Sequence, residues 1–257
     1  MTFRSLTIAT AFAILGVYLV LVGSLFTFLN PQRMLAALSS ERVIFSILLS
    51  IKAALIATFF AILLAIPAAY ALSRYNFRGK AIVDTLLELP LIVTPVAMGA
   101  MLLIFLNTRI GDSLQKNVWQ FVFEFSGIVL AQFLTTIGLA IRTIRSTFDE
   151  ISPRYEAVAC TLGATPMQAL LTTTLPMARK GILAAMMITF AKCIGEFGAT
   201  IMVAGAMPMK SETMPISIFM RLGSADIEGM AIMIMILLSA GLSVLFVIKF
   251  ILHTKYD

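Results

Sequence analysis

Two charged residues, Lys192 and Glu196, lie near the middle of a long apolar run, where a charge is least expected. A charged side chain at the centre of a bilayer costs on the order of 2.5 to 3.5 kcal/mol even on a lenient insertion scale. Both residues must therefore face protein or water rather than lipid. Their spacing of four places them on one helix face. We expect an internal ion pair, with direct contact to a transported substrate as the alternative.

The other reactive residue types form no catalytic pattern. The chain has one histidine, His253, and two cysteines, Cys160 and Cys193, and none of them has metal-ligand spacing around it. The methionines between Met207 and Met235 also lack regular ligand spacing, and methionine commonly fills gaps between packed helices. No phosphate loop of the form GxxxxGKS or GxxxxGKT is present. We therefore expect no metal, cofactor, nucleotide site or enzymatic activity in this chain itself.

A polar stretch, Glu156–Pro176, separates two long apolar runs and is punctuated by glycine and proline. Ser152-Pro153 ahead of it can cap and start a short helix, because the missing N–H of proline is harmless in a first turn. Thr165 can cap a second short helix, with Gln168 reaching back as a capping box. Gly163 supplies the positive φ that a tight turn needs. The stretch predicts helix, turn and helix, the second helix ending at the closing Leu-Pro pair.

These residues belong to a chain that is too apolar to be a soluble globule. Of its 257 residues, 60% are hydrophobic and 12% are charged, and the mean hydropathy is +1.00. A helix that crosses a hydrocarbon core of about 30 Å needs about 20 mainly apolar residues. Six runs reach this length without the alternation of barrel strands, which predicts an all-α integral membrane protein. The runs lie near residues 6–28, 43–72, 83–106, 121–141, 181–206 and 230–252.

We expect a single transmembrane domain over residues 1–257, because no connection is long enough to fold independently. The first run, about 6–28, is longer than the apolar part of a signal peptide and lacks a small-residue cleavage site, so it is expected to remain as a first helix. The core covers about 43–252. The segment of about 145–180, between the fourth and fifth runs, is the part best suited to meet another protein in water.

The third run contains Pro90 and Pro95, with Thr94 before the second proline. Prolines inside a span free backbone carbonyls that lipid cannot satisfy, so this segment should pack against protein or line a watery cavity. It is the one broken span that the sequence predicts. Glu88, near one end of the same run, is expected to be solvated or paired with an arginine.

Lysines and arginines in the short connections predict the orientation. With the N-terminus in the cytoplasm, the inner connections hold eleven of them and the outer connections hold six, which favours cytoplasmic termini. The net charge of +6 follows from this bias, so no nucleic-acid surface is inferred. The inner set is Arg4, Arg74, Arg78, Lys80, Arg142, Arg145, Arg154, Arg179, Lys180, Lys249 and Lys255; the outer set is Arg33, Arg42, Arg109, Lys116, Lys210 and Arg221.

The polar stretch resembles the EAA signature in the permease subunits of ABC importers. Its matching residues are Glu156, Ala157, Gly163, Leu175 and Pro176, whereas Val158 and Thr173 depart from the pattern. Residues 69–95 and 192–205 look like the corresponding blocks of molybdate, tungstate and sulfate permeases, in which an arginine is more common at the position of Lys192. The sequence Ala199-Thr200-Ile201 is closer to the molybdate or tungstate type than to the sulfate type.

The resemblance implies the type I ABC importer fold, with six helices and a coupling helix between the fourth and fifth. It also implies a homodimer in a prokaryotic cell membrane, two cytoplasmic ATPase subunits that bind ATP and Mg, and an extracytoplasmic oxyanion-binding protein. Transport would proceed by alternating access, most simply of molybdate or tungstate, with sulfate as the alternative. The residues expected to couple to the ATPase are Glu156, Ala157, Gly163, Ala164, Thr165, Pro166, Leu175 and Pro176.

Polarity and helix position select candidates for the pathway or gate: Pro90, Thr94, Pro95, Lys192, Glu196, Phe197 and Thr200. With few cations in the spans, we expect no tight dianion site in the pathway. A gradient-driven secondary transporter is the second hypothesis; it calls for paired broken helices, and only one is predicted. A membrane enzyme is a remote third, since the chain offers no plausible nucleophile or metal cluster.

Overall fold

The computed structural model describes residues 3–253, and within this range the chain is helical and forms no strand. The predicted all-α class is confirmed. The long helices are α1 (Phe3–Leu25), α3 (Glu41–Arg74), α8 (Phe125–Glu150), α11 (Leu175–Ile194) and α14 (Ile227–His253). The shorter ones are η1 (Phe26–Phe28), α2 (Pro31–Leu38), α4 (Lys80–Leu87), α5 (Leu89–Ile92), α6 (Pro95–Leu106), α7 (Arg109–Asn117), α9 (Arg154–Thr161), α10 (Pro166–Ala169), the π-helix η2 (Leu170–Thr174), α12 (Gly198–Ala204) and α13 (Met214–Gly223). Lys255, part of the charge count, lies outside the described residues.

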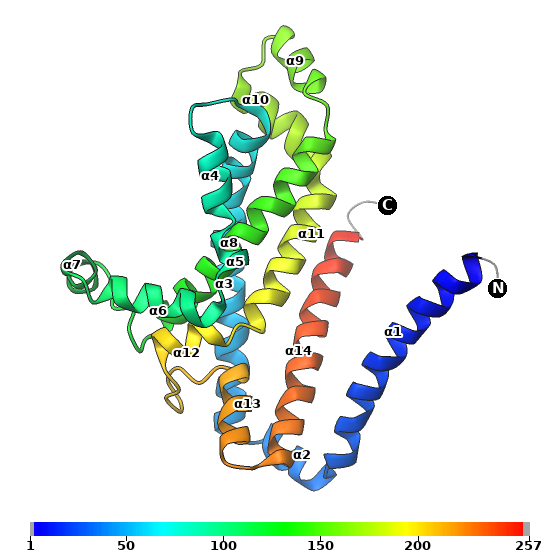
Figure 1. Ribbon diagram of the computed structural model, residues 1–257, viewed down its shortest axis with the longest axis vertical. Helices are drawn as coiled ribbons and strands as arrows, with labels where there is room; N and C mark the ends of the chain where they lie inside the picture. The colour runs from blue at the N-terminus through cyan, green and yellow to red at the C-terminus, as the bar shows by residue number, and fades with distance from the viewer. Residues whose placement is uncertain (1–2, 254–257) are drawn as a thin grey trace.

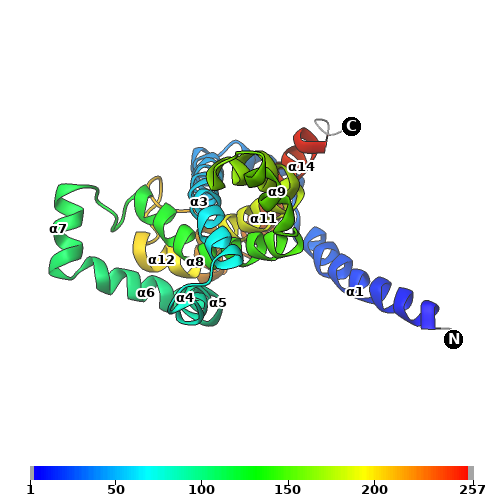
Figure 2. The same cartoon turned by 90° about the horizontal axis from the view of Figure 1, so that it is seen from above.

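Helices α3, α8 and α11 pack against one another along the length of the molecule and form its centre (Figure 1). The helices α9 and α10 lie at one end, which we call the α9 end, and α2 and α13 lie at the other, the α13 end. Seen from above, α1 leaves the body on one side, while α6 and α7 extend on the other (Figure 2). The side chains of α1 are exposed along nearly its whole length.

A row of alanines lets the central helices approach closely. Ala57, Ala61, Ala65 and Ala69 follow one another at a spacing of four on α3 and are fully buried. Ala61, Ala65 and Ala69 form part of a core with residues of α8 and α11, among them Ile144, and Ala57 belongs to a second core with Phe190 of α11. Small residues bring helix backbones together, which is the main source of packing energy when lipid is as apolar as the side chains.

The third apolar run is broken, as its prolines predict. The helix direction bends by 112° between the segment α4–α5 and α6. Val93 and Thr94, between α5 and α6, adopt extended backbone angles. For Thr94 the reason is the following Pro95, because a residue before proline is driven away from the helical region. The Thr94 hydroxyl then accepts a hydrogen bond from the Ala97 N–H at 3.4 Å and caps α6.

A second break follows α11, so the expectation of only one broken span is wrong. The chain bends by 56° between the segment Pro166–Ile194 and α12. This position has no proline. Gly195 is the C-cap residue of α11, and the three residues 195–197 separate α11 from α12. Among the described residues, four single helices are long and apolar enough to cross a membrane, and the two bent pairs bring the number to as many as six.

Candidate functional site

Glu156, near the start of α9, is held by three side chains at the α9 end. Its carboxylate accepts hydrogen bonds from the Tyr70 hydroxyl at 2.8 Å, the Arg74 Nε at 2.8 Å and the Thr174 hydroxyl at 2.7 Å. Tyr70 and Arg74 belong to the last turns of α3, and Thr174 ends η2. We call these four residues the Glu156 clamp. The clamp fixes α9 to one long helix and to the start of another.

The clamp is largely shielded from solvent. The side chain of Arg74 is 8% exposed and that of Glu156 is 13% exposed. Burial alone would raise the pKa of the Glu156 carboxyl, but hydrogen bonds from Thr174, Arg74 and Tyr70, together with the Arg74 charge, outweigh it and lower the pKa. Arg74 also donates to the Ile151 carbonyl at 2.8 Å, which ties the end of α3 to the residue after α8. The Glu156 carboxylate is therefore a fixed, internally paired anion.

The predicted turn and second cap of the segment are confirmed. Gly163 has φ of +94°, and Thr165 and Gln168 form both hydrogen bonds of a capping box. The first cap differs slightly from the prediction: α9 begins at Arg154, and the Ser152 hydroxyl accepts only a long contact, 3.4 Å, from the Arg154 N–H. Ala164 lies in the turn between α9 and α10 and is half-buried.

The predicted end of the second short helix is wrong. The helix α10 continues through the π-helix η2 directly into α11, with Leu175 and Pro176 in the first turn of α11. The Leu175 N–H donates to the Leu170 carbonyl, five residues back. Such wide turns accommodate a local irregularity without ending the helix, and proline needs no N–H partner in a first turn. The part of the segment formed by α10 and η2 is thus a direct extension of α11.

Apolar side chains of the segment point into solvent at the α9 end. Leu162 is 85% exposed, and Tyr155, Val158 and Met167 are also exposed, as are Ala157 and Pro166. Contiguous exposed apolar surface commonly marks a protein contact site. We call Tyr155, Val158, Leu162 and Met167 the α9 patch.

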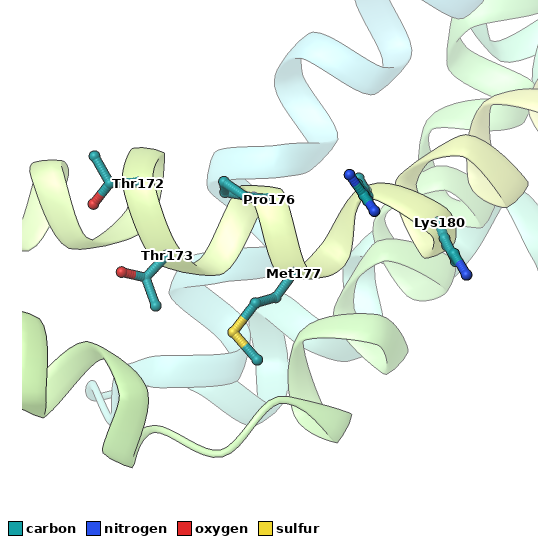
Figure 3. A pocket seen from close by; sticks show the side chains of 6 residues that line it. Thr172, Thr173, Pro176, Met177 and Lys180 are labelled. Carbon is teal, nitrogen blue, oxygen red and sulfur yellow. The ribbon is translucent and has the colours of Figure 1, made fainter. Parts of the chain in front are cut away.

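Beside the segment lies an open hollow of about 430 Å³ at the junction of η2 and α11. Its lining includes Thr172, Thr173, Pro176, Met177 and Lys180, whose side chains are drawn in Figure 3, and also Arg179. Arg179 and Lys180 give the hollow positive charge, so the α9 end presents charged as well as apolar surface.

The two breaks of the spans are joined where α6 crosses α12. A Cβ atom built on Gly198 would lie 3.1 Å from the Cβ of Pro95, and one on Gly99 would lie 2.6 Å from the Cα of Ala199. These glycines allow the backbones to touch at positions where any larger residue would separate them. The structure therefore places Pro95 beside the break that contains Glu196.

The predicted ion pair of Lys192 and Glu196 is not formed among the described residues. Glu196 is buried and accepts a hydrogen bond from the Ala199 N–H at 3.0 Å, at the start of α12, whereas Lys192 is exposed on α11. The prediction assumed a continuous helix. Because α11 ends at Ile194 and the chain bends before α12, the spacing of four no longer stacks the two side chains on one face.

The remaining pathway candidates lie near the same region without forming one polar site. The Phe197 ring lies 5.0 Å from that of Phe219, and the Thr200 hydroxyl is buried without a hydrogen-bond partner among the described residues. Pro90 lies in α5 against α8, 3.4 Å from the position that a Cβ on Gly138 would take. The structure brings Pro95 against Gly198, two residues after Glu196, and leaves Lys192 exposed on α11.

A buried polar stretch at the α13 end escaped the sequence reasoning. Residues 211–217 are buried, although the first three of them lie in the connection between α12 and α13. Glu212 accepts two hydrogen bonds from Arg42, at 2.7 and 3.0 Å, and the Met214 N–H donates to the Ser50 hydroxyl at 2.7 Å. These partners are 164 and 170 residues away in sequence, so no local pattern identifies them. Within the described part of the chain, no group of three or more His, Cys, Asp or Glu residues could hold a metal ion.

The chain is similar in sequence and in fold to known membrane transport proteins. A family model described as "binding-protein-dependent transport system inner membrane component" matches residues 57–256. The probable molybdenum ABC transporter permease protein HVO_B0370 of Haloferax volcanii is 33% identical over 228 residues, 88% of this chain and 82% of that protein. The sulfate transport system permease protein CysT of Salmonella typhimurium is 30% identical over 213 residues, 82% of this chain and 77% of that protein. A crystal structure of a bacterial ABC transporter for alginate import has the same fold, with a TM-score of 0.78 at 16% identity over 98% of this chain and 96% of its own.

Proposed function

The chain belongs to the family of inner membrane components of binding-protein-dependent transport systems, and from this premise we propose that it is the permease of an ATP-driven oxyanion importer. Membership of this family favours an ABC importer over a gradient-driven transporter. A gradient-driven transporter calls for paired broken helices, and the second broken span means that this requirement no longer speaks against it. Family membership therefore decides between the ABC importer and the gradient-driven transporter.

The observation that carries the proposal is the Glu156 clamp beneath the exposed α9 patch. The patch is the proposed docking site for an ATPase subunit. The clamp joins the patch to α3 and, through Thr174, to the continuous segment η2–α11. A docked protein that moves α9 would therefore move two long helices with it. In this proposal Glu156 positions the docking helix, and the neighbouring apolar side chains contact the partner.

We propose that the α9 end faces the cytoplasm and that both termini lie there. The elements around this end carry most of the Lys and Arg residues of the inner set, including Arg74, Arg78, Arg145 and Lys180. The ATPase subunits, with their ATP and Mg, would bind at this end. The extracytoplasmic binding protein would deliver the anion at the α13 end, and a second copy of the chain would complete the pathway.

The substrate class in this proposal is a tetrahedral oxyanion, with molybdate or tungstate first and sulfate as the alternative. Relatives named for molybdenum and for sulfate are similar to the chain at 33% and 30% identity. The buried Glu196 and the exposed Lys192 provide no cluster of positive charge at the breaks. Selection among anions is therefore assigned to the binding protein, with only transient contacts in the pathway.

Uptake by proteoliposomes tests the proposal. The chain is reconstituted with its ATPase and its binding protein, and uptake of labelled molybdate, tungstate and sulfate is measured with ATP or a non-hydrolysable analogue. We expect uptake only with ATP. Glu156→Lys and Gly163→Pro should insert into the membrane and abolish uptake, whereas Asp112→Lys on the exposed helix α7 should not. Uptake by the chain without any ATPase, or normal uptake by both variants, would contradict the proposal.

A further inference from the structure

We propose that a chain of charged and hydroxyl side chains connects the Glu156 clamp to the first broken span and transmits movement of α9 to it. The inference rests on the proposed function, since it concerns how docking is coupled to transport. It assigns positioning roles to residues outside the EAA-like stretch. In order from α9, the members of this polar chain are Glu156, Arg74, Ser73, Asp149, Arg145 and Asp84.

The first half of the polar chain runs from α9 through the end of α3 to α8. Arg74 pairs with Glu156 through Nε, and its Nη1 donates to the Ser73 hydroxyl at 3.1 Å. That hydroxyl donates in turn to the Asp149 carboxylate at 2.5 Å. Each contact joins different helices or neighbouring residues on α3, so a displacement of α9 reaches the last turn of α8 without passing through an apolar interface.

The second half runs from α8 to α4. Asp149 and Arg145 lie one turn apart on α8, with 3.7 Å between Oδ2 and Nε. Arg145 also forms a short ion pair with Asp84 of α4. The helix α4 leads through α5 to the 112° bend at Val93 and Thr94. The polar chain therefore ends on α4, in the segment α4–α5 that precedes the first break.

Apart from Leu87 at its end, which packs against the core, little else holds α4 in place, so the ion pair is the decisive contact of its first turns. No side chain of α4 is buried, and its apolar residues Ile82, Val83 and Leu86 are exposed. The next firm contact is the approach of the Leu87 carbonyl to Gly138 on α8, where an added Cβ would lie 2.5 Å from the oxygen. Loss of the ion pair between Asp84 and Arg145 would thus free α4 as far as Leu87 and leave the packing of the residues after Leu87 intact.

A branch of the same network reaches the second broken span. Thr174 donates to the Glu156 oxygen that also receives Arg74 Nε, and η2 continues into α11, which ends at the second break. One carboxylate therefore links α9 to both breaks, directly through Thr174 and along the polar chain through Asp84.

The test compares transport per ATP hydrolysed in the reconstituted complex. Asp84→Asn should insert and bind the ATPase normally, keep ATP hydrolysis within about two-fold of the unmodified complex and lower uptake about ten-fold, a coupling effect of ordinary size. Asp84→Glu, which keeps the carboxylate, should restore most of the uptake. Asp112→Asn is the matched control, because it removes an exposed pair with Lys116 that lies outside the polar chain.

A double-mutant cycle separates transmission from local damage. If the polar chain acts as a unit, Asp84→Asn combined with Glu156→Gln should lower uptake no further than Glu156→Gln alone. Ser73→Ala is a milder change in the middle of the polar chain and should also reduce uptake per ATP. This variant keeps the test valid if Asp84→Asn fails to insert into the membrane. Normal uptake per ATP in Asp84→Asn and Ser73→Ala, with an ATP-dependent unmodified complex, would overturn this inference alone. Loss of ATP dependence in the unmodified complex would instead overturn the proposed function.

Discussion

The carboxylate of Glu156 is a fixed anion because three donors from two other elements converge on it. A buried charge that loses its partners is costly, on the order of 3 kcal/mol. The surrounding side chains therefore keep α9 in one orientation, and the orientation of α9 determines where its apolar patch points. In the proposed function, Glu156 would therefore position the docking helix without contacting the partner itself.

The depressed pKa of Glu156 predicts that acid loosens the α9 segment. Because the folded pKa lies below the ordinary value of 4.5, the clamp contributes its full stability above that pH. The contribution is lost as the pH falls further, through the folded pKa. We expect the protection of the α9 amides, measured relative to their intrinsic exchange rates at each pH, to fall below pH 4.5 in the unmodified protein. In Glu156→Gln, this protection should be low already at pH 7 and should change little with pH; an identical acid response of the protection in both proteins would contradict this.

Local patterns predicted the backbone of this segment better than its contacts. The capping box of Thr165 and Gln168 and the turn at Gly163 depend on residues a few positions apart, and the structure confirms them. The partners Tyr70 and Arg74 lie 86 and 82 residues from Glu156. Nothing in the sequence around Glu156 identifies them, since tertiary folding alone brings the end of α3 to α9.

At the scale of elements, the crossing of α6 and α12 joins the two breaks. The contact depends on the absence of a side chain at Gly99, since a Cβ there would lie 2.6 Å from the Cα and 2.8 Å from the carbonyl oxygen of Ala199. Backbone atoms cannot rotate away as a side chain can. The crossing is therefore tightly packed, and we expect a displacement of one broken span to displace the other at this point.

Gly99→Ala is predicted to destabilise the protein and to impair transport. Overpacking of a close contact costs about 1 to 3 kcal/mol, which exceeds the gain of up to about 1 kcal/mol from placing alanine in a helix. The melting temperature of the detergent-solubilised protein should fall. Gly16→Ala in α1 is the matched control, because a Cβ there meets nothing within 4 Å; its melting temperature should stay the same or rise. An equal response of the two variants would rule out a tight crossing.

The two breaks show which element boundaries a sequence can reveal. Pro90 and Pro95 predicted the first break because proline removes a backbone donor and restricts the residue before it. The second break, at Gly195, has no proline, and the apolar run continues on both sides of it. The ion pair expected of Lys192 and Glu196 was wrong for the same reason, because it required the helix to continue.

For the whole molecule, composition and the lengths of the apolar runs were sufficient to predict an all-α membrane protein. The two arms that leave the body in opposite directions, α1 and α6–α7, could not be predicted, since their orientation depends on bends and packing rather than on hydropathy (Figure 2). The exposed apolar side chains on these arms, such as Tyr18 and Ile104, are suited to contact with lipid or with a second copy of the chain.

The two cysteines give the protein a built-in reporter. Cys160 is exposed on α9, beside the α9 patch that is the proposed docking site, whereas Cys193 of α11 is buried against α3 and α8. A maleimide dye should therefore label the unmodified chain at Cys160 alone, as mass spectrometry of the labelled peptide would check. Bound ATPase should slow this labelling, and labelling at an unchanged rate would place the partner elsewhere. The natural sequence thus allows docking to be timed in a working transporter without engineering a single residue.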